Sequence, residues 1–247
     1  MTTDRTTNEI PMTTRLLFRD DAYETTCEAT VIAVNERGGV ILDRTVFYPT
    51  GGGQPGDRGA LVRADGTTIP VATAVWSEDK AHVVHVPAEG AALPQAGERV
   101  TATIDGDVRL KRMRLHTALH LLTTVLPYPV TGGAIGDGEG RLDFDIPDAV
   151  DREAIAAALA DRIARNAAVT ERWITDEELD ANPGLVKTMS VKPPRGSGRV
   201  RLVDIEGLDL QPCGGTHVRN TAEIGPVAVT AIEKKGKLNR RVRIALV

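Results

Sequence analysis

The 247-residue sequence has few aromatic residues, only two cysteines and no long apolar run. Because aromatic side chains make up 3% of the chain, the stacking platforms typical of single-strand nucleic-acid binding are not evident. No run is apolar enough to span a membrane, and the polar start of the chain lacks the apolar core of a signal peptide. We therefore expect a cytoplasmic protein with no membrane partner and a disordered lead over residues 1–12.

The two cysteines, Cys27 and Cys213, lie in different halves of the chain. A disulfide between them is not expected, because a cytosolic domain of this size buries a sizeable core without one. Cys27 falls in a strand-like run and is expected to be a small buried residue. Cys213 is followed by two glycines, a threonine and His217, so a cysteine and a histidine stand at the spacing of metal ligands.

Short β-like runs separated by turns occupy residues 13–105, without helical periodicity of useful length. They cover residues 26–35, 40–42, 61–63, 69–76, 82–86 and 99–104. The first run ends at Gly38-Gly39, which indicates a hairpin. Many short strands with turns between them predict a small antiparallel β-barrel domain over residues 13–105.

Residues 106–247 mix helical and strand patterns. Helices are expected from Asp105–Asp107 to Pro127, from Asp148 or Asp151 to about Val169, and from a Thr175/Glu178 capping box to Asn182. Strands are expected over residues 141–146, 199–205, 226–233 and 240–247, and residues 130–136 read as a flexible strand or loop. The fold class is therefore α+β, with an N-terminal barrel followed by a domain of helices on a mostly antiparallel sheet.

His116 and His120 are spaced so that, on a helix, both imidazoles project from one face. Leucines at positions 115, 119, 122 and 126 form a separate stripe. We expect the helix to bury the leucines in a core and to present the two histidines to a neighbouring cavity.

A second group of metal-binding residue types lies far downstream, at Cys213 and His217. Together with His116 and His120 they supply one thiolate and three imidazoles, a set that suits one Zn²⁺ ion per chain. A zincin protease would need a glutamate after the first histidine, where this chain has Thr117. The site is either a closed structural centre or one where the ion also binds water or a substrate oxygen.

Charge is distributed unevenly along the chain. Residues 1–108 carry nine basic and 16 acidic side chains, whereas residues 109–247 carry 21 basic and 18 acidic ones. The basic residues of the second half cluster near residues 109–114, 192–201 and 234–243. Each cluster alone is compatible with a solvated surface, but three together favour a surface for an anionic backbone.

A glycine-rich segment lies within the first half, Phe47-Tyr-Pro-Thr-Gly-Gly-Gly-Gln-Pro-Gly-Asp57. Its glycines allow the backbone to approach a ligand closely. It lacks the Gly-Lys-Ser/Thr ending of a phosphate-binding loop and no helix follows it. By itself the segment is read as a convoluted turn of the barrel.

His-Thr-Ala-Leu-His (116–120) and Cys-Gly-Gly-Thr-His (213–217) together resemble the editing domain of alanyl-tRNA synthetase and its freestanding relatives, the AlaX alanyl-tRNA editing proteins. The glycine-rich segment, with Gly51, Gly52, Gly53 and Gln54, resembles the motif of the medium-length class of these proteins. The resemblance covers residues 13–247. No class II aminoacylation core precedes these motifs, so the chain is not expected to be a synthetase.

The resemblance implies zinc on His116, His120, Cys213 and His217 in a deacylase domain over residues 106–247. It also implies that Thr131 recognises the side chain of serine, with Gly132 and Gly133 beside it in the substrate-binding segment. The synthetase branch often reads Ser-Gln-Lys-Gly-Ser here, so Gly132 stands where that branch has a glutamine. No residue is assigned as a general base.

The expected function is hydrolysis, in trans, of mischarged tRNA(Ala), chiefly Ser-tRNA(Ala), with Gly-tRNA(Ala) as a further candidate. Two alternatives stay open: a zinc-stabilised tRNA-binding module without catalysis, and a zinc hydrolase of small esters or amides. Cationic side chains expected to contact the tRNA are Arg112, Arg114, Lys192, Arg195, Lys234 and Lys235.

Overall fold

The computed structural model describes residues 13–189, 198–236 and 238–247, which fall into two compact units. The first unit consists of the described residues up to Thr50 and of Gly56–Asp105. The second consists of Gly51–Pro55 and the described residues from Gly106 onward. Five residues from the middle of the glycine-rich segment therefore belong to the second unit, and the residues that flank them belong to the first.

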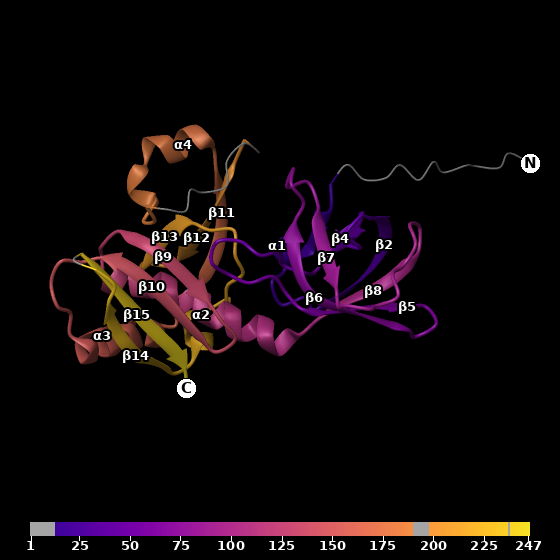
Figure 1. The fold of residues 1–247 in the computed structure, drawn as a ribbon. Helices are drawn as coiled ribbons and strands as arrows, with labels where there is room; N and C mark the ends of the chain where they lie inside the picture. The colour runs from indigo at the N-terminus through magenta and orange to yellow at the C-terminus, as the bar shows by residue number, and fades with distance from the viewer. Residues whose placement is uncertain (1–12, 190–197, 237) are drawn as a thin grey trace, which may run out of the picture. The chain divides into compact units, whose positions relative to one another are not determined.

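The first unit is built around a closed six-stranded barrel (Figure 1, indigo to purple). Its strands follow the order β2-β3-β7-β6-β5-β8, and every neighbouring pair with a described register is antiparallel. Irregularities of register interrupt the β2–β3 and β6–β7 pairs, and such bulges increase the local twist of a sheet. The strands are β2 (Thr26–Val34), β3 (Val40–Leu42), β5 (Gly59–Arg63), β6 (Thr68–Trp76), β7 (Val83–Pro87) and β8 (Arg99–Ile104).

Alternating apolar side chains fill the interior of the barrel. Val31, Leu42, Leu61 and Ala102 are all at most 1% exposed. The predicted hairpin at Gly38-Gly39 is confirmed as the β2–β3 connection. Three short elements were not predicted: β1 (Arg15–Leu16), its parallel partner β4 (Arg44–Thr45), and helix α1 (Leu17–Asp20). They are too short to give a periodic pattern.

The second unit contains a four-stranded antiparallel sheet in the order β14-β15-β10-β9. Its strands are β9 (Val130–Ile135), β10 (Glu139–Asp145), β14 (Val227–Lys234) and β15 (Asn239–Leu246). Helices α2 (Gly106–Val125) and α3 (Arg152–Ala164) pack against each other and against this sheet (Figure 1). The segment read as a flexible strand or loop is thus strand β9, whose pairing with β10 shifts register between Asp143 and Phe144.

A second, three-stranded antiparallel sheet has the order β11-β12-β13. It is formed by β11 (Val169–Ile174), β12 (Val200–Ile205) and β13 (Asp209–Pro212). The predicted extension of α3 to Val169 is wrong: the helix ends at Ala164, because Asn166 adopts a φ of 55° and the β-branched residues after it enter β11. β11 has an almost entirely exposed run, which hides it from a pattern search.

The remaining elements are short. The Thr175/Glu178 capping box is confirmed at the start of α4 (Asp176–Ala181). Two 3-10 turns follow, η1 (Pro183–Leu185) and η2 (Thr221–Ile224). Among the helices of the described ranges, none combines the length and apolarity needed to cross a membrane.

Helix α2 is the central element of the second unit. The leucine stripe is confirmed, since Leu115, Leu119, Leu122 and Leu126 are at most 6% exposed. The opposite side is also buried, including Arg109 at 1% and both histidines. A helix buried around most of its circumference is held rigidly, and His116 and His120 inherit that rigidity.

Candidate metal centre

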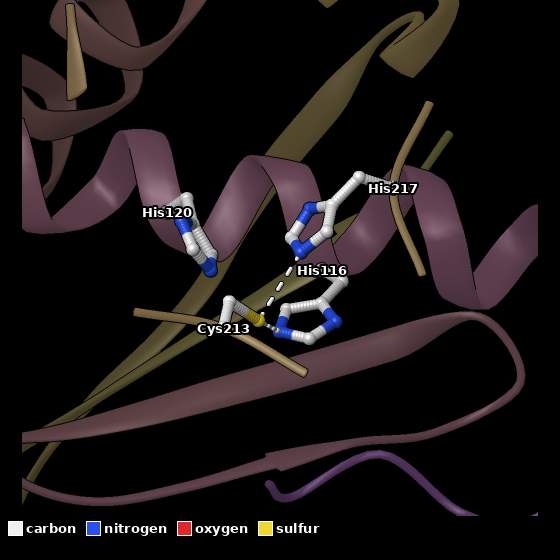
Figure 2. A group of neighbouring side chains, drawn as sticks. All are labelled: His116, His120, Cys213 and His217. Carbon is white, nitrogen blue, oxygen red and sulfur yellow. Dashed lines mark hydrogen bonds between the residues drawn. The ribbon is translucent and has the colours of Figure 1, made fainter. Parts of the chain in front are cut away.

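Four side chains that the sequence analysis singled out converge in the second unit. His116 and His120 project from α2, whereas Cys213 and His217 come from the segment that follows β13 (Figure 2). One ligand atom from each residue lies within 4.8 Å of the others. The thiol sulfur of Cys213 is 3.4 Å from Nε2 of His116 and 3.3 Å from Nε2 of His217.

The outward-facing Nδ1 atom of each histidine has a hydrogen-bond partner. Nδ1 of His116 lies 3.0 Å from Oε1 of Gln54, and Nδ1 of His120 lies 3.1 Å from a carboxylate oxygen of Asp209. Both partners are acceptors, so both Nδ1 atoms donate. Nδ1 of each ring therefore carries a proton, which makes Nε2 the atom that can bind a metal.

Thr117 has the same effect on the third histidine. Its hydroxyl donates to the carbonyl oxygen of Met113 at 3.0 Å and lies 3.1 Å from Nδ1 of His217. Because its one proton is already given to Met113, the hydroxyl accepts from Nδ1–H of His217. Thr117, which replaces the glutamate of a zincin, thus orients a ligand instead of supplying a base.

The glycine-rich segment contributes Gln54, which is fully buried. Besides its contact with His116, Oε1 of Gln54 accepts from the backbone N–H of Thr216 at 3.1 Å, and Nε2 donates to the Thr216 hydroxyl at 2.9 Å. Gly53 bonds to the edge of the sheet, where Ile135 N donates to its carbonyl oxygen at 2.9 Å. Sequence reasoning treated this segment as a motif but did not identify the contact of Gln54.

A buried polar network behind His120 was also missed. The carboxylate of Asp209 is fully buried and accepts from Lys187 Nζ and, at 2.6 Å, from Gln211 Nε2. A signal was present: Asp209, Gln211 and Cys213 alternate along one strand and its continuation, so their side chains share a face. The Asp209 carboxylate therefore orients His120, and Lys187 and Gln211 fix the position of that carboxylate.

The backbone between Cys213 and His217 passes close to His116. A Cβ atom on Gly215 would lie 2.2 Å from Cε1 of His116, so only glycine fits there. Arg201 fixes the same loop, because its Nη1 donates to the carbonyl oxygens of Cys213 at 2.8 Å and Gly215 at 2.9 Å. The Arg201 guanidinium is also paired with Glu171. Arg201 therefore belongs to the support of this loop.

The electrostatics of the cluster favour a cation. Burial opposes ionisation of Cys213, but electrostatic interactions with His116 and His217 outweigh it and hold the pKa of the thiol well below its usual range. Burial, followed by the charge of His116, holds the pKa of His217 well below its usual range. A thiolate and a neutral imidazole are the forms that bind a metal.

His120 and Asp209 influence each other. Burial disfavours the imidazolium, but hydrogen bonds to Asp209 and Cys213 outweigh burial and raise the pKa of His120 to about 9. Burial likewise disfavours the carboxylate, yet His120 and Lys187 lower the pKa of Asp209 to about 2. The anionic Asp209 and Cys213 on either side of His120 make this a site for positive charge. The donor types, the inward-facing Nε2 atoms and this charge together fit a bound metal ion.

The predicted substrate-binding residues lie on strand β9. The Thr131 hydroxyl donates to the carbonyl oxygen of Asp143 at 3.2 Å and accepts from Asn239 Nδ2 at 2.7 Å. Gly132 is paired with Asp143 across the sheet. The carbonyl oxygen of Gly133 would be 3.1 Å from a Cβ on Gly53, so the glycine-rich segment packs closely here.

Strand β9 is joined to the network behind His120 by one hydrogen-bonded segment. Val130 N donates to the carbonyl oxygen of Lys187 at 3.0 Å. The side chain of Lys187 reaches Asp209, which holds His120. The start of β9, with Thr131, is thus anchored to the support of a candidate ligand.

The predicted tRNA-contacting cations have different surroundings. Arg112 is 5% exposed and paired with Asp137 at 2.8 Å, and Arg114 Nε donates to the carbonyl oxygen of Ile224 at 2.7 Å. Lys235 is exposed and paired with Glu233 at 2.8 Å, whereas Lys234 is exposed at the end of β14. Lys192 and Arg195 lie outside the described residues.

Comparisons with known proteins place the chain in a family. The family model described as threonyl and alanyl tRNA synthetase second additional domain matches residues 200–243, and the model of class II (A) tRNA synthetases matches residues 8–108. The alanyl-tRNA editing protein AlaX-M of Methanosarcina mazei is 36% identical over 243 residues, which cover 94% of this chain and 96% of the relative. The AlaX-M protein of Saccharolobus solfataricus is 34% identical over 234 residues, with 93% and 97% covered.

A longer protein also matches. The alanine–tRNA ligase of Korarchaeum cryptofilum is 36% identical over 230 residues, which cover 90% of this chain but 25% of the ligase. The resemblance read from the two histidine motifs and the glycine-rich segment is thereby confirmed. The chain belongs to the family of alanyl-tRNA editing proteins of the AlaX-M type.

Proposed function

We propose that this protein hydrolyses the aminoacyl ester of mischarged tRNA(Ala) in trans, releasing the amino acid and free tRNA. Two findings support the proposal: membership in the AlaX-M family, and the convergence of four ligand atoms within 4.8 Å of one another. The convergence is the decisive observation, because it brings four potential metal ligands of this family member together in one site. As a member of this family the chain is an enzyme, an aminoacyl-tRNA deacylase. We propose that it acts in the cytoplasm.

The domain roles follow from this activity. Residues 13–105 form the β-barrel domain, and residues 106–247 form the deacylase domain. Gly51–Pro55 complete the deacylase domain, because Gln54 holds both His116 and Thr216. The glycine-rich segment is thus a functional part of the editing site.

Zn²⁺ is the proposed ion, one per chain, held by His116, His120, Cys213 and His217. Tetrahedral sites of nitrogen and sulfur ligands are typical of zinc. When bound, zinc supplies Lewis acidity, which a thiolate ligand moderates. Gln54, Thr117 and Asp209 keep the three imidazoles in the Nδ1–H form that such a site requires.

Selectivity is assigned to Thr131, with Gly132 and Gly133 forming the adjacent backbone. A pocket that activates alanine cannot exclude the smaller glycine and rejects the added hydroxyl of serine only about a hundredfold. A second site that hydrogen-bonds the serine hydroxyl spares alanine, since alanine leaves its polar groups unpaired. The Thr131 hydroxyl is the group proposed to make this bond, and Ser-tRNA(Ala) is the proposed main substrate.

A closed structural zinc site is the second candidate, because four protein ligands fill a tetrahedral shell. Purified Ser-tRNA(Ala), Gly-tRNA(Ala) and Ala-tRNA(Ala) are incubated with the protein, and loss of each labelled amino acid is followed with and without chelator. His116→Ala is compared with His82→Ala, which removes a histidine of the barrel.

The proposed function predicts rapid loss of the serine label, sparing of alanine, and loss of activity with chelator or with His116→Ala but not with His82→Ala. Salt-dependent tRNA binding without any deacylation would instead identify a zinc-stabilised binding module. Hydrolysis of small free esters that excess tRNA does not inhibit would identify a small-ester hydrolase.

A further inference from the structure

A basic groove of about 440 Å³ lies at one end of the four-stranded sheet, away from the metal ligands in sequence. Arg152, Lys234 and Arg240 line it, together with apolar atoms of Val150 and Ile232. The three cations come from the start of α3, the end of β14 and the start of β15. Among the residues that the structure describes, no acidic side chain lines the groove.

The two strand residues of this groove face each other directly. Lys234 and Arg240 are partners in the β14–β15 register. Like charges placed opposite each other across two strands repel and destabilise the pair unless an anion lies between them. In the described part of the chain, neither these two residues nor Arg152 forms an ion pair with a carboxylate.

Neighbouring cations are neutralised internally, which makes the groove distinct. Lys235 and Arg243 are both paired with Glu233, and Arg241 is paired with Asp143. The described basic residues of this cluster therefore divide into a group paired with carboxylates and a pair that is not, Lys234 and Arg240.

The Arg240 guanidinium is held in place by neutral backbone carbonyl groups, so no carboxylate offsets its positive charge. Its Nη1 donates to the carbonyl oxygen of Asn239 at 3.2 Å, and its Nη2 donates to that of Pro147 at 2.9 Å. The nearby Asp151 carboxylate caps α3 by accepting from the N–H groups of Glu153 and Ala154, and Asp148 is exposed in the same connection. A fixed guanidinium in an open groove suits a phosphate oxygen.

The groove lies at the end of the four-stranded sheet where β9 begins, since Arg240 pairs with Phe144 of β10, which in turn pairs with Val130 of β9. Asn239, which precedes Arg240, donates to the Thr131 hydroxyl at 2.7 Å. A chain of phosphates that enters the groove would therefore pass the end of the sheet where β9 begins. We propose that Arg152, Lys234 and Arg240 form a binding site for the phosphodiester backbone of the tRNA substrate; this rests on the proposed function.

The test measures affinity for uncharged tRNA(Ala) at several salt concentrations for Lys234→Gln, Arg152→Gln and Arg240→Gln. Each loss of a phosphate contact is expected to lower affinity about threefold or more and to reduce the slope of log K against log salt by about one. Arg165→Gln is the matched control, because it removes a charge from the opposite end of α3, where Arg165 pairs with Asp161. The control should retain the wild-type slope.

Deacylation kinetics and metal content complete the experiment. For Lys234→Gln we expect a raised KM for Ser-tRNA(Ala), an unchanged kcat and an unchanged metal content. Lys234 is exposed, so this variant stays informative even if Arg240→Gln, which loses the bond to Pro147, folds poorly.

The outcomes separate the two proposals. Wild-type affinity and salt slope in folded Lys234→Gln and Arg152→Gln, in a protein that deacylates Ser-tRNA(Ala), overturn the groove and leave the function standing. Reduced affinity in these variants, in a protein that deacylates nothing, supports the groove and overturns the function.

Discussion

Gln54 and His116 are 62 positions apart in the sequence, yet Oε1 of Gln54 lies 3.0 Å from Nδ1 of His116. The same oxygen accepts from the backbone of Thr216, beside His217. One amide thus links the helix that carries two candidate ligands to the loop that carries the other two. This contact gives the glycine-rich segment a specific task.

Gln54→Leu should lower metal affinity about 10- to 100-fold, because His116 loses the acceptor that fixes its orientation. The buried N–H groups of His116 and Thr216 are also left unpaired, at a cost of about 1–3 kcal/mol each. Metal affinity is measured by competition with a coloured chelator. Gln95→Leu, at an exposed position of the barrel unit, is the control. Equal affinity of the two variants would remove Gln54 from the support of the site.

Asp209→Asn should weaken metal binding about 10- to 100-fold, since His120 then faces a neutral acceptor and Lys187 loses its buried counter-charge. The shape of the side chain is retained, so the effect reports charge. Metal content after dialysis against a weak chelator provides the measurement. The control is Asp204→Asn, which changes a β12 carboxylate that pairs with Arg172 of β11. This variant should bind metal as the wild type does. Full metal retention in Asp209→Asn would contradict the role of this network.

Thr131→Val should reduce the preference for serine over alanine about tenfold, because one hydrogen bond to the substrate hydroxyl is lost. The comparison is the ratio of kcat/KM for Ser-tRNA(Ala) and Ala-tRNA(Ala), together with metal content, which should not change. Thr170→Val, at an exposed position of β11, is the control. An unchanged ratio would remove Thr131 from substrate recognition.

Stability of the barrel should depend on pH through His85. This side chain is fully buried between the Thr45 hydroxyl and the carbonyl oxygen of Val40, and burial lowers its pKa from 6.5 to about 4. The unfolded chain therefore binds the proton more tightly, so stability is fully present above pH 6.5 and falls towards pH 4. The loss is about 3 kcal/mol at most.

Urea unfolding between pH 4 and 7 measures this effect. Trp76 lies in the barrel strand β6, so its fluorescence in a Trp173→Phe background reports the first unit alone. His85→Gln should flatten the pH dependence between pH 4 and 6.5, although the variant is less stable at pH 7. A wild-type pH dependence in this variant would show that another group is responsible.

Local patterns in the sequence were sufficient for the helix that carries two of the candidate ligands, but they did not predict β13 (Asp209–Pro212), which leads to the other two. The spacing of His116 and His120, the leucine stripe and the Thr175/Glu178 capping box depend only on helix geometry, which repeats every few residues. The confirmed hairpin at Gly38-Gly39 depends on strand alternation in the same way. The metal-binding chemistry of cysteine and histidine then grouped one thiolate and three imidazoles as one set of ligands, and the motifs that contain them resembled those of a known family.

The tertiary structure alone decided which distant groups support that set. The contacts of Gln54 with His116, of Asp209 with His120 and of Arg201 with Gly215 join residues 62, 89 and 14 positions apart. No local period encodes such contacts, because they depend on how sheets and helices pack. The same holds for charge, because the pairing of β14 with β15 places Lys234 opposite Arg240.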